Sequence, residues 1–255
     1  MRILSIDLDY ISGPAINHND DRLRELQSQD DADGTDMWPV PHWSELFDKY
    51  PNEFSHEISI ENYQYCLRAF LRALKNCSDV HFGYDHDNIL YGLEGHKDIE
   101  IVNIDHHDDI FSGNWGHPEQ EINALKTFDR VMEGNWGMWL QIKGRLKSFT
   151  WIGNADSHNL VHVPFAEQYI NNFRFCTREQ YDFASDCKFD QIFVCLSPTY
   201  IPPLHWHMIG TFMTVYEEMT GSKVDLNKFN RKYEMEKYYT QVTEYITKGK
   251  NAITK

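Results

Sequence analysis

The stretch IEIVNIDHHDD, residues 99–109, indicates the fold most clearly. Its first six residues form an apolar run typical of a buried strand, and a dense group of carboxylates and histidines follows at once. The same order recurs at two other places, where an apolar run leads into Asp7-Leu8-Asp9 and into Gly83-Tyr84-Asp85-His86-Asp87. Counting two further apolar runs, the predicted strands are Arg2–Ile6, Asp79–Phe82, Ile99–Ile104, Phe149–Ile152 and Gln191–Leu196.

Segments with helical spacing separate several of these strands. The predicted helices are Ile60–Cys77, Asn123–Met132, Trp136–Lys143, His207–Gly221 and Tyr233–Lys248. Strands that alternate with helices predict an α/β fold of three layers, with helices on both faces of a mainly parallel sheet. The polar, acidic run at 12–51 is interpreted as an excursion inserted into a single domain that spans residues 1–255.

The composition excludes several classes of protein. Lys and Arg number 24 against 39 Asp and Glu, so the formal charge is −15, which disfavours binding of nucleic acid. No apolar run reaches the roughly 20 residues that span a bilayer, and a carboxylate at position 7 comes too early for a signal peptide. The five cysteines form no CxxC pair. We therefore expect a cytoplasmic protein without a membrane anchor.

The carboxylates and histidines that follow the strands predict a metal site. In an open α/β sheet, ligands bind at the carboxyl ends of the strands. Because residues two apart in extended backbone face the same side, Asp7 and Asp9 are expected to face one point, and so are Asp105, His107 and Asp109. Carboxylates packed this densely repel one another unless a cation lies between them. The oxygen-rich set suits Mn²⁺ better than Zn²⁺, with Fe²⁺ as an alternative, and it is large enough for two ions.

These motifs resemble those of a known superfamily. Asp105-x-His107-x-Asp109 resembles the DxHxD metal motif of the arginase and deacetylase superfamily, residues 83–87 resemble its GGDHS element, and residues 5–9 resemble its SxDxD element. The resemblance implies an arginase-like fold and two manganese ions, with Asp7 and Asp105 bridging the ions. The implied metal ligands are Asp7, Asp9, His86, Asp105, His107 and Asp109.

Departures from the ordinary arginase pattern indicate a particular branch. The SxDxD element opens this chain, whereas it comes last in arginases, and His106 replaces a small residue inside DxHxD. With Gly134-Asn135-Trp136, these features look more like a divergent branch that includes peptide arginases. The resemblance implies a hydrolase that converts arginine side chains to ornithine, with release of urea. The implied partner is an arginine-containing, ribosomally made precursor peptide.

The resemblance also implies roles around the metals. Asp109 would orient the attacking nucleophile, and His117 would protonate the departing amine, with His158 and His106 as alternatives. Asp156 and Asn135 are candidate substrate contacts. Arginases grip the guanidinium with a carboxylate after the last strand, but here no acid follows that strand before Glu217, so Asp85 and Asp87 are considered as replacements. Trp136 and Trp139 are interpreted as core packing.

Three other functions remain open at this point. One is a small-molecule ureohydrolase, and a second is a deacetylase of acylated amines that uses one zinc ion. The third is not an enzyme but a metal-containing, peptide-binding protein. The number of bound ions separates the deacetylase from the ureohydrolases. The sequence assigns no oligomeric state.

Overall fold

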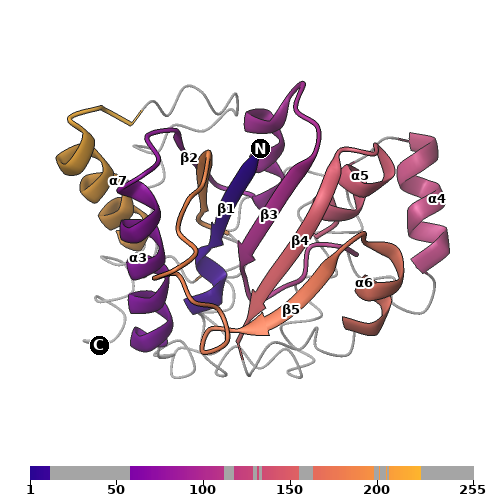
Figure 1. Cartoon of the computed structure of the whole chain (residues 1–255), viewed down its shortest axis with the longest axis horizontal. Helices are drawn as coiled ribbons and strands as arrows, with labels where there is room; N and C mark the ends of the chain where they lie inside the picture. Colours follow the sequence, from indigo (N-terminus) through magenta and orange to yellow (C-terminus); the bar gives the residue numbers. More distant parts are fainter. Residues whose placement is uncertain are drawn as a thin grey trace, which may run out of the picture.

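A six-stranded sheet forms the centre of the molecule. The computed structural model describes residues 1–11, 58–111, 118–128, 131, 134–154, 163–197, 201, 205 and 207–224. The strands are β1 (Arg2–Asp7), β2 (Val80–Gly83), β3 (Ile99–Ile104), β4 (Leu146–Gly153), β5 (Phe173–Thr177) and β6 (Gln191–Cys195). Their order is β2-β6-β1-β3-β4-β5, and every neighbouring pair is parallel (Figure 1).

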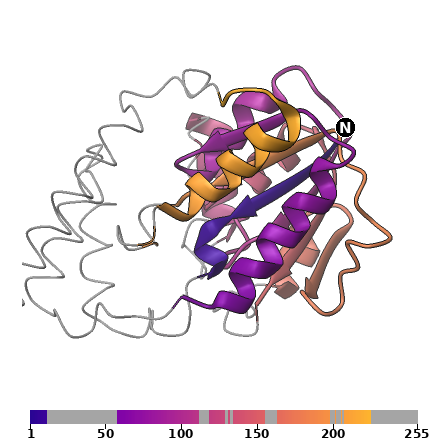
Figure 2. The same ribbon diagram turned by 90° about the vertical axis from the view of Figure 1, so that its left-hand side faces the viewer.

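Helices cover both faces of this sheet. On one face lie α3 (Ile60–Leu74) and α7 (His207–Thr220), side by side (Figure 2), and Phe70 of α3 packs against Phe82 of β2 and Phe212 of α7. On the other face lie the 3₁₀ helix η2 (His86–Leu93) and α5 (Trp136–Ile142). Near β4 and β5 lie α4 (Pro118–Phe128) and α6 (Val163–Tyr169) (Figure 1). The predicted three-layer α/β fold is confirmed.

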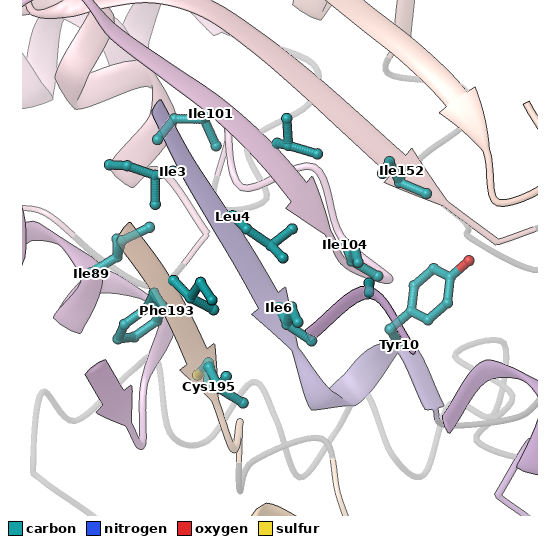
Figure 3. Packing of buried hydrophobic residues seen from close by; sticks show 14 of the residues in the cluster. Ile3, Leu4, Ile6, Tyr10, Ile89, Ile101, Ile104, Ile152, Phe193 and Cys195 are labelled. Carbon is teal, nitrogen blue, oxygen red and sulfur yellow. The ribbon is translucent and has the colours of Figure 1, made fainter. Parts of the chain in front are cut away.

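The strands at the centre of the sheet are buried on both faces. Ile3, Leu4 and Ile6 of β1 have no exposed surface, and they pack among Ile101, Ile104 and Phe193 of the neighbouring strands (Figure 3). A parallel strand covered on both sides needs apolar residues in succession, which explains the continuous apolar runs in the sequence. Each fully buried aliphatic side chain contributes about 1.5–3 kcal/mol. The strand ends are therefore held on a well-packed base.

The chain leaves β1 in a tight turn that the next helix secures. Residues Leu8–Ile11 form the 3₁₀ helix η1. Ser59 caps α3, since its Oγ accepts a hydrogen bond from the Asn62 N–H, and the Ser59 N–H donates to the Ile11 carbonyl at 2.8 Å. The start of α3 thus fixes the segment that carries Asp9.

The path of the chain creates a binding position beside β1. From β1 it passes through α3 to β2 on one side of the sheet, whereas β3 pairs with β1 on the other side. Such a reversal of direction opens a crevice at the carboxyl ends of the strands. The motifs after β1, β2 and β3 all lie at this edge.

Most predicted elements are present, with shifts at their ends. All five predicted strands exist; the one expected at Phe149–Ile152 is longer, and α3 ends at Leu74 rather than at Cys77. Pro118 opens α4 five residues before the predicted start at Asn123, because proline fits the first turn of a helix and Glu119 and Glu121 favour its N-terminus.

Several elements were not predicted. Strand β5 has only five residues, and its partly exposed Phe173 and Phe175 flank Arg174, so it carries no continuous apolar run. The helices η1, η2 and α6 are short and have little periodicity. The run at 12–51 and the helix predicted at Tyr233–Lys248 lie outside the described residues. None of the described helices is long and apolar enough to cross a membrane.

Candidate metal centre

The site lies where β1 and β3 end side by side. Asp7 is the last residue of β1, and Asp105 directly follows β3. His86 opens η2 after β2, which is separated from β1 by β6. The imidazole of His86 reaches the site across β6, stacked on Phe193 with ring centroids 5.9 Å apart. Three segments distant in sequence therefore meet at one edge of the sheet.

One set of side chains, Asp7, His86 and Asp105, forms the inner group. His86 Nδ1 lies 3.0 Å from Asp7 Oδ2 and 3.0 Å from Asp105 Oδ2. Asp109 belongs beside them, since its Oδ2 is 2.6 Å from the same nitrogen. His86 Nδ1 is thus buried among three carboxylate oxygens. Ligand atoms around a six-coordinate ion are about 3 Å apart, so this spacing fits a shared cation.

The second set, Asp9, Asp105 and His107, forms the outer group. His107 Nδ1 lies 2.6 Å from Asp9 Oδ2 and 4.0 Å from Asp105 Oδ1. Main-chain N–H groups hold the two carboxylates: His106 donates to Asp9 Oδ1 at 3.3 Å and His107 donates to Asp105 Oδ1 at 2.7 Å. The turn after β3 thus orients this group through its backbone.

Asp105 belongs to both groups and connects them. Its Oδ2 faces His86 in the inner group, and its Oδ1 faces His107 in the outer group. A carboxylate that offers one oxygen to each of two positions is the arrangement that bridges paired metal ions. Asp7, for which the resemblance also implies a bridging role, lies in the inner group alone.

The candidate ligands are not arranged as extended backbone would place them. Asp7 and Asp9 do not face one point, because the chain turns into η1 at Leu8 and separates them into the two groups. Asp109 likewise leaves the regular alternation, since its φ of +55° lies in the left-handed region. That turn places it beside His86 rather than beside His107.

Two buried serines support the inner group. Ser5 Oγ lies 2.6 Å from His86 Nε2, so the hydroxyl occupies that nitrogen and leaves Nδ1 facing the carboxylates. Ser197 Oγ donates to Asp7 Oδ2 at 2.5 Å from the segment after β6. Both contacts fix the orientation of a candidate ligand.

Asp105 has support of its own. Asn103 Nδ2 donates to Asp105 Oδ2 at 2.9 Å, and Trp151 Nε1 on β4 donates to the Asp105 main-chain carbonyl at 3.0 Å. Asn103 and Asp105 are fully buried. Sequence reasoning missed Asn103 and Ser197. A polar residue inside an apolar strand, two positions before Asp105, was a usable signal for Asn103; Ser197 had none.

The electrostatics of the site reflect its concentrated charge. Burial raises the pKa of Asp7 to about 6, and the charge of Asp9 adds to the rise. Burial and the neighbouring carboxylates also raise the pKa of Asp105 well above its ordinary value. Burial opposes the charged form of His107, yet the attraction of Asp9 raises the pKa of His107 to about 9. The pKa of His86 is likewise raised, although burial opposes it, because Asp109 and Asp7 attract its proton. Protons and a divalent cation therefore compete for the same positions.

The structure brings together the six predicted metal ligands, which are Asp7, Asp9, His86, Asp105, His107 and Asp109. Among the predicted catalytic and substrate residues, His106 lies beside His107, with ring centroids 5.0 Å apart. The amide of Asn135 is buried and donates to Glu121 Oε1 at 3.2 Å. His117, Asp156 and His158 lie outside the described residues.

The two alternative guanidinium anchors precede and follow His86. Asp85 comes directly before η2, and Asp87 Oδ1 accepts a hydrogen bond from Asn88 Nδ2 at 2.9 Å. Both are partly exposed, whereas His86 between them is buried. They therefore lie at the margin of the inner group.

No protein-family model, no curated protein and no solved structure matches this chain.

Proposed function

We propose that this protein is a binuclear metal hydrolase of the arginase type, which converts arginine side chains within a peptide to ornithine and releases urea. The observation that carries the proposal is the position of Asp105, which offers one carboxylate oxygen to each of two groups of ligands. A single-ion site does not need this sharing. Two ions are therefore favoured over the single zinc of an amide deacetylase.

The chemistry of the donors supports Mn²⁺, with Fe²⁺ as the alternative. The two groups consist of carboxylate oxygens and imidazole nitrogens, and neither contains a thiolate. Cys195 pairs with Asp7 in the sheet register, but its Sγ lies 3.0 Å from the Tyr84 carbonyl. Hard oxygen ligands suit Mn²⁺, whereas Zn²⁺ prefers nitrogen and sulfur.

Residues of the chain divide the work of the proposed reaction. The six ligands would hold two cations, which supply an activated water and stabilise negative charge that develops at the reacting centre. Asp109, at the edge of the inner group, orients the attacking water. A histidine donates a proton to the departing amine; the resemblance favours His117, and His106 lies next to the outer group.

A peptide is the proposed form of the substrate because of charge. The chain has a net charge of −15, which attracts a guanidinium and disfavours the α-carboxylate of free arginine. In a peptide both α-groups are neutral amides. Contacts along the peptide would then provide the orientation that a free amino acid obtains from its own termini.

Mass spectrometry tests the reaction directly. The full-length protein with Mn²⁺ is incubated with an arginine-containing peptide, and each converted arginine loses CH₂N₂ while urea appears. A peptide with lysine in place of arginine is the control. Metal analysis of the same sample distinguishes two manganese ions per chain from one zinc ion.

The other functions predict different results. Faster release of urea from free arginine than from the peptide would show a small-molecule ureohydrolase. Removal of acetyl from an acetyl-lysine peptide by protein with one zinc would show a deacetylase. If the protein bound the arginine peptide but converted neither it nor the acetyl-lysine peptide, the non-enzymatic function would remain. Each of these three results overturns the proposed function.

A further inference from the structure

The indole of Trp136 contacts two residues of the metal centre at once. Its Nε1–H donates to Asp109 Oδ2 at 2.8 Å, and its ring centroid lies 5.1 Å from that of the His86 imidazole. Trp136 is fully buried at the first position of α5, where Phe149 of β4 packs against it at 5.5 Å. The ring serves the core, as the sequence predicts, but its polar edge is directed at a candidate ligand.

The residue after Trp136 holds the backbone of the same aspartate. The Gly137 N–H donates to the Asp109 carbonyl at 3.0 Å. A Cβ at position 137 would lie 3.0 Å from that carbonyl oxygen and 3.1 Å from the Phe149 ring, so glycine permits this close approach. Asp109 has a φ of +55°, a conformation that non-glycine residues rarely adopt without such support. Two adjacent residues of α5 thus hold both the side chain and the main chain of Asp109.

The start of α5 is itself connected to α4. Asn135, directly before Trp136, donates its amide hydrogen to Glu121 Oε1 at 3.2 Å, and both side chains are buried. In this structure Asn135 therefore secures the helix that carries Trp136. The contacts run from α4 through the start of α5 to the inner group.

We propose that Trp136 is a positioning residue of the metal centre: its indole N–H orients the carboxylate of Asp109 while its ring restrains the imidazole of His86. The inference rests on the metal-binding part of the proposed function and is independent of the substrate. Partners that hydrogen-bond to metal ligands typically change metal affinity 10- to 100-fold when they are removed. Trp136 acts on the inner group alone, because neither contact involves Asp9 or His107.

Calorimetric titration of metal-depleted, full-length protein with Mn²⁺ tests this role. Trp136→Phe keeps a ring against His86 but removes the N–H, so affinity for one of two ions should fall about 10- to 100-fold while the other changes little. Trp139→Phe is the matched control: Trp139 lies one turn along the same helix, and its ring contacts Lys143 and Arg145. Unchanged affinity for both ions in Trp136→Phe would overturn the proposal.

Two further measurements separate positioning from packing. In an Asp109→Ala background, Trp136→Phe should change Mn²⁺ affinity less than about twofold, because the carboxylate that it orients is gone. If Trp136→Phe still lowered the Mn²⁺ affinity about 10- to 100-fold in that background, the proposal would be overturned. If Trp136→Phe does not fold, Gly137→Ala decides: the added Cβ displaces α5 from Asp109, and the same ion should bind more weakly. Wild-type affinity in a folded Gly137→Ala protein would then contradict the role.

The failure of this proposal differs from failure of the proposed function. Protein that binds two Mn²⁺ ions but leaves arginine unchanged overturns the reaction, and the affinity of Trp136→Phe still decides the role of the indole. Protein that converts arginine while Trp136→Phe retains wild-type affinity overturns only the role of Trp136.

Discussion

The inner and outer groups share Asp105 but differ in how the fold surrounds them. In the inner group Asp7, His86 and the adjacent Asp109 are all buried. In the outer group Asp9 is buried, but the side chain of His107 is 24% exposed. One position is enclosed by the sheet and by α5, and the other opens toward solvent.

Their means of support differ in the same way. Side chains from four segments hold the inner residues: Ser5, Asn103, Trp136 and Ser197. The outer group depends largely on main-chain N–H groups of the turn after β3. The inner position is thus arranged by tertiary packing, whereas the outer position is arranged by the local backbone and is the more exposed of the two.

The largest loss of metal binding and turnover is expected from a substitution of Asp105, the residue that both groups share. Asp105→Ala removes an anionic ligand from both groups, so both ions should be lost and turnover should fall at least about 1,000-fold. Metal analysis and the peptide assay measure this. Glu100→Gln is the control: Glu100 is partly exposed on β3, the strand that Asp105 follows, and this variant should retain both ions. An Asp105→Ala protein that keeps two ions would show that the groups do not share this carboxylate.

Metal removal should lower stability. An ion that binds only the folded state at 100 times its dissociation constant contributes about 2.7 kcal/mol, which corresponds to a Tm change of about 5–10 °C in a protein of this size. Thermal unfolding before and after chelation measures the change. The inner ion should be the slower to leave because its ligands are buried. Equal and immediate loss of both ions would remove the distinction between the groups.

The metal-free protein should become less stable as pH rises. His107 has a pKa of about 9 in the folded chain against 6.5 when unfolded, so its stabilising proton is fully present below pH 6.5 and is lost as pH rises through about 9. The shift corresponds to about 3 kcal/mol. The Mn²⁺ affinity should rise with pH, because the ion must displace that proton. Denaturant unfolding at pH 6.5 and 9, with and without Mn²⁺, measures both slopes. A His107→Gln protein with the same slope as wild type would contradict this assignment.

The sequence was a good guide to the sheet and to the identity of the clustered residues. Buried parallel strands leave continuous apolar runs, and the polar residues after them necessarily meet at one edge. The three motifs were therefore enough to predict a metal site at this edge, and the resemblance added His86 to its ligands. Strand β5 was missed because an edge strand with an arginine between its two phenylalanines has no such run.

The division of the ligands between two groups could not be predicted from the sequence. The expectation that Asp7 and Asp9 face one point assumed extended backbone, but η1 begins at Leu8. Supporting residues far along the chain were equally hidden: Ser197 lies 190 positions from Asp7, and only the β1–β6 pairing brings them together. The local sequence pattern predicts which residues cluster, and tertiary packing decides which of them lie in the same group.

The smallest change in Mn²⁺ affinity is expected from Ser5, which contacts a candidate ligand but is not itself a ligand. Ser5→Ala removes the hydroxyl 2.6 Å from His86 Nε2, so the imidazole loses the contact that directs Nδ1 toward the carboxylates. Mn²⁺ affinity of the inner position should fall about 10-fold, and the outer position should be nearly unchanged. Ser148→Ala, on a half-buried part of β4, is the matched control. If Ser5→Ala lowered the affinity for both ions equally, the two positions would be coupled through Asp105. Their different surroundings would then not make them independent.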